Sequence, residues 1–326
     1  MTRPSTTRKL FGALGAGALV LALAACGGGE DGDGDSAAAA NQLTWNYSLP
    51  DSAPVLLGIE EGIFEKHGID LVAEEAAATD LVGALISGKV DLSVNTGPGM
   101  AVAAGQNVPV VAVSGVSTFE AGASGSSGSA LVVPKGSDIT TPKDLEGRKV
   151  GVNLLKSASE FGVRQVVVDD GGDDKKVEIV EVPFAAVADA FASGDIDAAL
   201  VADPFMTQLI DGGAEVPFGD PIETVFAESP RLVMTATREW ADANSDTVDA
   251  LQDAVAESIE LADEDPDKLI PIFEKYFKMK PEVAKATKIN KLQADISPSS
   301  FDTINDVLAQ YGGIAKPIDV EQVVAK

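Results

Sequence analysis

The sequence has 326 residues and a formal net charge of -27 at pH 7, from 51 acidic and 24 basic side chains. A chain of this length can bury a large core in one or two domains. The negative charge disfavours nucleic acid and anionic lipid surfaces as partners, and the single cysteine excludes a disulfide within the chain.

The first residues have the pattern of an export signal. Three basic residues within the first nine positions precede an apolar run, Leu10 to Ala25, of 16 residues, which is shorter than the roughly 20 that a membrane-spanning helix needs. The run ends in LAAC, which resembles the lipobox of bacterial lipoproteins, where the cysteine is lipidated and becomes the mature N-terminus. We therefore predict a lipoprotein signal peptide at residues 1–25 and lipidation at Cys26.

A flexible tether is predicted between the lipid and the folded part. Residues 26–42 contain GGGEDGDGDSAAAANQ, which is too polar and too rich in glycine to pack. Loss of residues 1–25, which carry three positive charges and no negative ones, changes the net charge from -27 to -30.

From Leu43 onward, short apolar runs alternate with helix-like segments, which predicts an α/β fold with mostly parallel strands. The strands expected in the first part are Leu43 to Tyr47, Ile69 to Ala73, Val90 to Val94, Val108 to Val113 and Ala130 to Val133. The helices expected there are Val55 to Phe64, Thr79 to Ser87 and one that starts near Pro98, and Gly115 to Ser129 is expected to be a loop.

A second unit repeats this order. Its expected strands are Lys149 to Val152, Val177 to Val182 and Ile196 to Val201, and its expected helices are Ser159 to Val168 and Ala186 to Ala192. The stretch SGKVDLSVNTGP at residues 87–98 returns as SGDIDAALVADP at residues 193–204, which suggests two similar lobes. We expect the first lobe at residues 43–133, the second at 134–228, and a return to the first at 229–326.

The tail supports this division. Arg231 to Thr237 is a plausible strand that returns to the first lobe, and two chain crossings would form a hinge. From Trp240 the chain is expected to be helical, with apolar residues at helical spacing.

Ligands of parallel α/β sheets bind beyond the carboxyl ends of the strands, so we examined the loops at those positions. The candidate ligand-binding residues are Ser48, Asp51, Thr96, Gly97, Phe119, Ser157, Ser159 and Asp203. Structural roles compete with this interpretation: Ser157 and Glu160 fit a capping box, Asp203 suits a helix N-cap, and Phe119 is an aromatic residue that could belong to the core.

The sequence gives little support for catalysis. His67 is the only histidine and lies in a polar turn, and Cys26 lies outside the fold, so neither a Cys-His pair nor a histidine-rich metal site can form. We predict a protein that is not an enzyme and that has no cofactor and no metal site.

Four segments carry a resemblance to a known family. GIEEGIFEKHGIDL, ALISGKVDLS, DLEGRKVGV and SGDIDAALVADPF resemble, in their order and spacing, the solute-binding lipoproteins of ABC importers of the nitrate/sulfonate/taurine type, which are similar to binders of thiamine-precursor pyrimidines. The resemblance implies a type II periplasmic-binding-protein fold, with two lobes, a ligand cleft and a two-strand hinge. It also implies a lipid-anchored, extracytoplasmic and monomeric receptor that delivers a small solute to an ABC permease.

The identity of the solute is left open. The family suggests a sulfonate, taurine or nitrate, but Lys156 is the only basic residue in the loops examined. A pyrimidine or another thiamine precursor, stacked on aromatic side chains, is the alternative ligand. A ligand sensor or adaptor lipoprotein with the same fold is the alternative function.

Overall fold

The computed structural model describes residues 41–77, 80–120 and 128–325. The predicted signal peptide, the lipidation site Cys26 and the tether up to residue 40 lie outside the described residues.

The first sheet has five strands in the order β2-β1-β3-β9-β4. They are β1 (Asn41–Tyr47), β2 (Ile69–Glu75), β3 (Leu92–Thr96), β4 (Val110–Thr118) and β9 (Pro230–Thr237). β1 pairs in parallel with β2 and β3, whereas β9 pairs antiparallel with both β3 and β4. After the strands of the second sheet, the chain thus returns to the first sheet through β9.

The second sheet has four strands in the order β5-β8-β6-β7. They are β5 (Ser129–Val132), β6 (Lys149–Val152), β7 (Glu178–Glu181) and β8 (Ala198–Ala202). The sequence analysis assigned residues up to 133 to the first lobe, but β5 lies in the second sheet because it pairs antiparallel with β8. We call each sheet with the helices packed on it a lobe.

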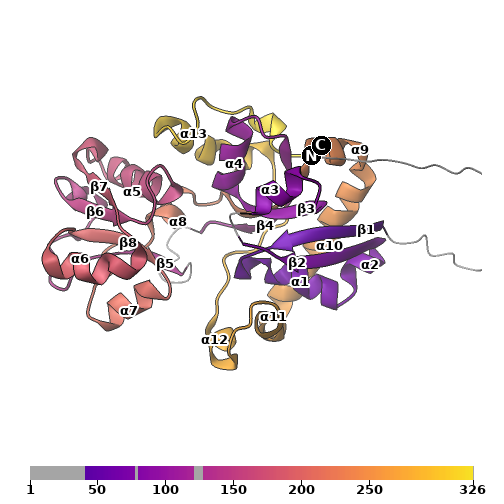
Figure 1. Cartoon of the computed structure of the whole chain (residues 1–326), viewed down its shortest axis with the longest axis horizontal. Coiled ribbons are helices and arrows are strands. Elements are labelled where there is room, and N and C mark those ends of the chain that lie inside the picture. Colours follow the sequence, from indigo (N-terminus) through magenta and orange to yellow (C-terminus); the bar gives the residue numbers. More distant parts are fainter. Residues whose placement is uncertain (1–40, 78–79, 121–127, 326) are drawn as a thin grey trace, which may run out of the picture. The chain divides into compact units, whose positions relative to one another are not determined.

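Helices cover both sheets (Figure 1). The first lobe has α1 (Ala53–Glu60), α2 (Ile63–Lys66), α3 (Leu81–Ile86), α4 (Gly97–Gly105), α9 (Arg238–Ala243), α10 (Ser245–Glu264), α11 (Leu269–Tyr276), α12 (Pro281–Ala286) and α13 (Asp302–Gln310). The second lobe has α5 (Ala158–Asp169), α6 (Val187–Ser193), α7 (Phe205–Asp211) and α8 (Pro221–Val225). All these elements belong to one compact unit, and none of the helices in the described part of the chain is long and apolar enough to cross a membrane.

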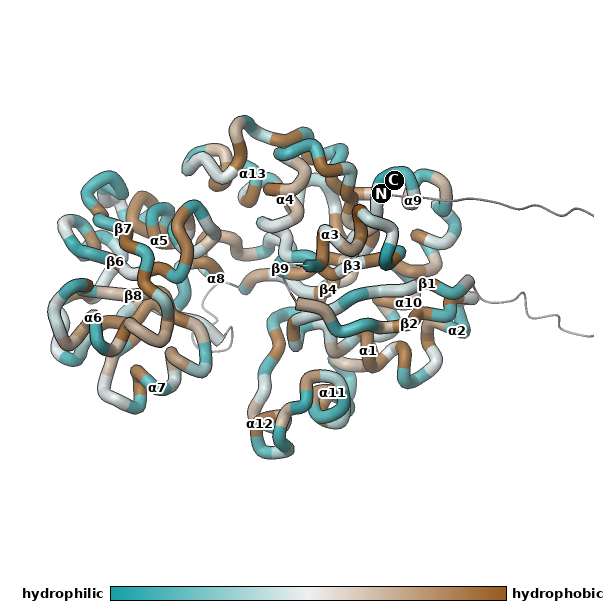
Figure 2. Tube along the Cα trace, viewed as in Figure 1, coloured by the Kyte–Doolittle hydropathy of each residue, from teal (hydrophilic) through white to brown (hydrophobic). Residues whose placement is uncertain are grey.

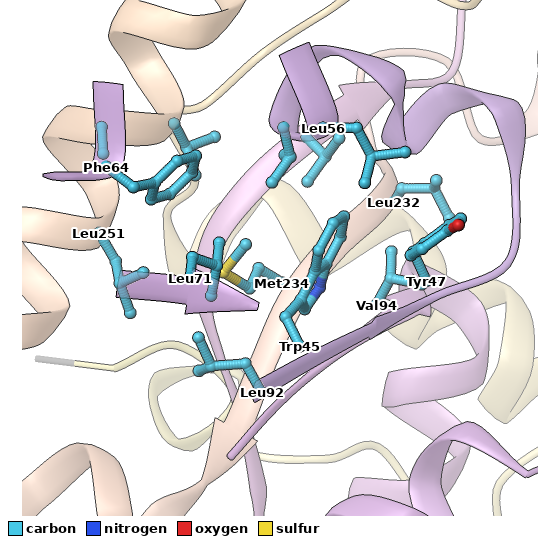
Figure 3. Close-up of a cluster of buried hydrophobic side chains, with 14 of the residues drawn as sticks. Trp45, Tyr47, Leu56, Phe64, Leu71, Leu92, Val94, Leu232, Met234 and Leu251 are labelled. Atoms are coloured by element: carbon cyan, nitrogen blue, oxygen red, sulfur yellow. The ribbon is translucent and has the colours of Figure 1, made fainter. Parts of the chain in front are cut away.

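The first core lies between the sheet and the helices α1 and α10. Trp45 and Tyr47 point from β1 into this core, which also contains Leu56 of α1 and Leu251 of α10 (Figure 3). The side chains of Trp45, Leu56 and Leu251 are fully buried. Figure 2 shows the hydrophobic stretches of β3 and β9 in the middle of this lobe. Burial of each such side chain contributes about 1.5–3 kcal/mol to folding.

Three predicted boundaries are wrong, each for a local reason. The helix expected from Val55 to Phe64 is divided in two, because Gly62 has a positive φ of 70° and starts α2 anew. The loop expected from Gly115 continues β4 as far as Thr118, where hydrogen bonds to β9 and to residues 291 and 294 hold the strand. The tether ends before Asn41, because Asn41 already pairs with Ile69 of β2.

Contact between α1 and α10 depends on a residue without a side chain. A Cβ atom on Gly58 of α1 would come within 1.9 Å of the Ser258 Oγ of α10. Ser258 is itself fully buried and donates a hydrogen bond to the Ala254 carbonyl oxygen, so it cannot withdraw into solvent.

We expect Gly58→Ala to lower the free energy of unfolding by about 1–3 kcal/mol, because the two helices must separate to admit the methyl group. Gly83→Ala is the matched control: Gly83 lies within α3, and no atom lies within 4 Å of the added Cβ. The control should be neutral or stabilise the protein by up to about 1 kcal/mol. Urea unfolding of both variants measures the difference, and equal stabilities would contradict the role of this close approach.

Candidate functional site

Three neighbouring cavities lie where the carboxyl ends of the strands meet. The largest, about 590 Å³, is lined by Leu49, Pro50, Asp51, Gly128, Asp203, Arg231, Val283, Ala286, Thr287, Lys288 and Asn290, and we call it the acidic chamber. The second, about 200 Å³, is lined by Leu49, Thr96, Pro98, Phe119, Ser129, Ala158, Ile222, Arg231 and Leu232, and we call it the apolar neck. The third, about 250 Å³, is lined by Ser48, Leu49, Leu81, Val82, Val94, Asn95, Thr96, Gly99 and Leu232, and we call it the amide pocket. Leu49 borders all three, so we treat them as one cleft.

Both lobes contribute to the acidic chamber. Asp51 follows β1 of the first sheet, and Asp203 follows β8 of the second. Each of the two residues comes after a strand that ends at the cleft. The rule that ligands bind beyond the carboxyl ends of parallel strands therefore locates both carboxylates correctly.

Asp51 is the most heavily bonded group of the chamber. Its Oδ2 atom accepts hydrogen bonds from Ser117 Oγ at 3.1 Å, from Arg231 Nε at 3.1 Å and from Asn290 Nδ2 at 2.9 Å. Its side chain is buried. These bonds tie the loop after β1 to β4, to β9 and to the segment after α12.

Arg231 connects Asp51 to a second carboxylate. Its Nε is paired with Asp51, its Nη1 is paired with Glu223 of α8, and its guanidinium carbon lies 5.5 Å from the centre of the Phe119 ring. Glu223 also accepts a hydrogen bond from the backbone N–H of Glu120 at 3.0 Å. Because Arg231 opens β9, where the chain re-enters the first sheet, this cluster stands at the second crossing between the lobes.

The environment of Glu223 changes its acidity. The Glu223 side chain is only 2% exposed, and burial raises its pKa to about 7, although the Arg231 charge acts in the opposite direction. The nearby Asp220 and Asp51 carboxylates raise it further.

Two buried polar atoms at the cleft have no hydrogen-bond partner among the described residues. They are Asn290 Oδ1, in the wall of the acidic chamber, and Ser48 Oγ, in the wall of the amide pocket. Buried polar groups are normally satisfied, so each unsatisfied one calls for an explanation. A ligand or water in the cleft would supply the missing partners.

Five of the eight predicted ligand-binding residues line the cleft. Asp51 and Asp203 share the acidic chamber, Thr96 and Phe119 lie in the apolar neck, and Ser48 lies in the amide pocket.

Gly97 does not line the cleft but packs against β9. A Cβ atom there would come within 2.0 Å of the Pro230 carbonyl oxygen, so this glycine allows α4 to approach β9. Thr96 just before it caps α4 through a 3.1 Å hydrogen bond from the Gly99 N–H.

Ser157 and Ser159 are not among the lining residues, although Ala158 between them is. Ser157 Oγ donates to the Leu154 carbonyl oxygen at 2.7 Å, and Ser159 Oγ donates to Asn153 Oδ1 at 3.2 Å. The expected capping box is wrong: the Glu160 carboxylate accepts from the Lys156 N–H instead of the Ser157 N–H.

Asp203 does cap α7, although it lies one residue before the N-cap position and not at it. The N-cap position of α7 is Pro204, but Asp203 Oδ1 accepts hydrogen bonds from Thr207 N at 3.0 Å and from Thr207 Oγ1 at 2.7 Å. The second carboxylate oxygen of Asp203 has no hydrogen bond from the described residues.

The sequence analysis missed Arg231, Glu223, Lys288 and Asn290. Arg231 was included in a predicted strand, and Lys156, the basic residue that was considered, does not line the cleft. Asn290 follows α12 in a segment with no regular pattern, so no periodicity could indicate it. Within the described residues, no group of three or more histidine, cysteine or acidic side chains could hold a metal ion.

Known proteins resemble this chain in sequence. The family described as NMT1/THI5 like matches residues 49–269. A Haemophilus influenzae protein assigned to thiamine biosynthesis is 28% identical over 160 residues, which are 48% of each chain. The formylaminopyrimidine-binding protein of Halalkalibacterium halodurans is 23% identical over 221 residues, which are 66% of this chain and 64% of the relative. The chain thus covers less than two thirds of either relative.

Solved structures share the fold. The periplasmic aliphatic sulphonate-binding protein SsuA of Escherichia coli is 19% identical, with a TM-score of 0.70 over 88% of this chain and 92% of that one. The desulfurization enzyme DSZB is 16% identical, with a TM-score of 0.60 over 87% and 96%. The predicted two-lobe binding-protein fold is therefore confirmed, and the fold alone does not separate receptors from enzymes.

The raised pKa of Glu223 predicts a pH dependence of stability. Between its ordinary pKa of 4.5 and about 7, the folded protein keeps a proton that the unfolded chain loses, so the free energy of unfolding decreases as the pH rises through this window. The decrease from this group should reach about 3 kcal/mol, at 1.36 kcal/mol per pKa unit.

Glu223→Gln should remove that part of the pH dependence. Urea unfolding of the variant and the wild type between pH 4.5 and 8 measures it, because all other titrating groups are shared and cancel in the difference. Parallel stability profiles for the two proteins would contradict the raised pKa.

Proposed function

The chain belongs to the NMT1/THI5-like family, and from this membership and the geometry of its cleft we propose that it is the extracytoplasmic solute-binding lipoprotein of an ABC importer. It captures a small organic solute and delivers it to a membrane permease. Residues 43–133, 134–228 and 229–326 remain the proposed division into lobes, with β5 moved to the second. We propose no enzymatic activity.

The observation that carries this proposal is that both lobes supply carboxylates to one cavity. Asp51 comes from the first lobe and Asp203 from the second. A ligand shifts a conformational equilibrium only if it binds one state better than the other. A solute that contacts both carboxylates stabilises the arrangement in which the lobes enclose it, which is the state a permease must recognise.

The N-terminal sequence pattern supports the proposed extracytoplasmic location. In this proposal residues 1–25 direct export, Cys26 carries the lipid, and the glycine-rich segment that follows lets the receptor reorient at the membrane. The folded part acts as a monomer, and neither nucleic acid nor a cofactor takes part.

The ligand is proposed at the level of its class. The name of one relative refers to a formylaminopyrimidine and that of a structural neighbour to aliphatic sulphonates. Sulfonates, taurine, nitrate and pyrimidines are therefore the compounds to test. A sensor or adaptor lipoprotein is the competing function, which a neighbouring receptor-kinase gene would favour over a permease gene.

Asp203→Ala should weaken solute binding at least tenfold, because the second lobe loses its carboxylate in the chamber. Native mass spectrometry of the full chain, purified in detergent before and after denaturation, identifies the bound solute, and calorimetry then measures its affinity. The variant should also lose about 1 kcal/mol of stability from the cap of α7.

Asp173→Ala is the matched control for this experiment. The Asp173 carboxylate likewise accepts a hydrogen bond from a backbone N–H, that of Lys175, but it does not line the cleft. The control should show a similar loss of stability and unchanged affinity. If both variants bind the solute as tightly as the wild type does, Asp203 has no part in recognition.

Cys26→Ser should abolish labelling of the protein with palmitate and release it from the membrane fraction, because the modified thiol is lost. Metabolic labelling followed by fractionation measures both effects. Persistence of the label in the variant would refute lipidation at this residue.

A further inference from the structure

The acidic chamber presents hydrogen-bond acceptors. Asp51 Oδ2 receives three donors, whereas Asp51 Oδ1 receives none from the described residues. Asn290 donates through Nδ2 to the Asp51 carboxylate, and this fixes its amide orientation, because only the nitrogen can donate. Its Oδ1 atom is therefore an acceptor in the chamber wall, on a side chain only 7% exposed, without a partner in the described chain.

Asp203 adds a further acceptor from the opposite lobe. Thr207 occupies its Oδ1 atom, and its Oδ2 atom has no donor among the described residues. The chamber is thus lined by one buried amide oxygen without a partner, that of Asn290, and by two carboxylates, of which Asp51 is buried and Asp203 is exposed to solvent. A ligand that fills the chamber must bring N–H or O–H groups to satisfy them.

The charges in the chamber also favour a ligand that donates hydrogen bonds. Arg231 is shared between Asp51 and Glu223, and the Asp51 carboxylate alone already balances its one positive charge. Asp203 has no ion-pair partner among the described residues. Lys288 and Asp203 both line the chamber, and both are exposed to solvent, which weakens the interaction of each charge with buried groups.

An anionic solute fits this arrangement poorly. The oxygen atoms of a sulfonate or nitrate would face Asp51 Oδ1, Asn290 Oδ1 and the Asp203 carboxylate, all of which repel them. The half-buried Arg231 still has N–H groups to donate, but its charge is already neutralised by Asp51.

Accepting the proposed solute-binding function, we propose that the solute carries a protonated or N–H-rich nitrogen group of the amine or amidine type, which sits in the acidic chamber between Asp51, Asn290 and Asp203. The apolar part of the solute extends into the neck, against Phe119 and Ile222. Charge-assisted hydrogen bonds to the carboxylates give the specificity, and the neck supplies apolar contact.

Calorimetry with four ligands that share a benzene ring, and with nitrate, tests this assignment. The probes are benzylamine and benzamidine as cations, benzenesulfonate and nitrate as anions, and benzyl alcohol as the neutral compound, each titrated into the full chain in detergent. We expect the cations to bind at least tenfold more tightly than the others, and the mass released from the native protein to contain a basic nitrogen.

Charge-removing variants then locate the contact. Asp51→Asn and Asp203→Asn should each reduce cation affinity at least fivefold, and Asp203→Asn keeps the α7 cap because its oxygen can still accept from Thr207. Asp263→Asn is the control, since it removes the same charge from α10 at a site outside the cleft. It should leave binding unchanged.

The outcomes separate this inference from the proposed function. Binding of benzenesulfonate or nitrate in preference to the cations, or affinity that is unchanged in both cleft variants, overturns the inference while solute binding stands. If none of the five probes binds and no mass is released on denaturation, both the ligand assignment and the proposed solute-binding function are overturned.

Discussion

The cleft depends on one ion cluster, in which Arg231 holds Asp51 and Glu223 together. Each member comes from a different element: the loop after β1, the first residues of β9, and α8. Buried charges are costly unless they are paired and hydrogen-bonded, so loss of Arg231 would leave the acidic side chains of Asp51 and Glu223 without a counter-charge. The backbone N–H of Glu120, the Ser117 hydroxyl and the Asn290 amide complete the pairing. A single half-buried guanidinium therefore fixes the loop after β1 against the crossing segment of the chain.

A second contact between the lobes lies apart from this cluster. The ring of Phe161 in α5 stacks on Tyr311, which follows α13, with ring centres 6.0 Å apart, and Gly313 leaves room for it. Gln165 of α5 accepts a hydrogen bond from the Tyr311 hydroxyl at 3.1 Å. The C-terminal segment thus fastens the second lobe to the first through an apolar contact, while the ion cluster acts at the chain crossing. When the lobes move relative to each other, the ring contact and the ion cluster each either stay intact or break completely. This favours a few discrete arrangements of the lobes over continuous movement.

Local patterns predicted the strands well, and the position of Asp51 and Asp203 beyond strand ends predicted their place at the cleft. The apolar runs of β1, β6 and β9 are dictated by burial, which leaves a clear mark in the sequence. Arg231 could not be recognised in this way, because its role follows from the antiparallel insertion of β9 between β3 and β4. Asn290 belongs to an irregular segment that long-range contacts alone bring to Asp51. Ser157 shows the opposite error: a fitting local motif gave way to a nearer partner, the Leu154 carbonyl oxygen.

The unsatisfied atoms at the cleft have a consequence for the energy of the protein. A buried polar group without a partner costs about 1–3 kcal/mol, and the Asn290 amide oxygen and the Ser48 hydroxyl are both such groups within the described chain. A protein selected for stability alone would replace them with apolar side chains of similar size. Both atoms lie in the walls of the cleft, so an occupant that forms hydrogen bonds with them would recover free energy that folding alone leaves unrecovered. If a solute fills the cleft as proposed, ligand affinity and folded-state stability are coupled at this site, because the groups that lack partners within the protein are the ones that the solute would contact.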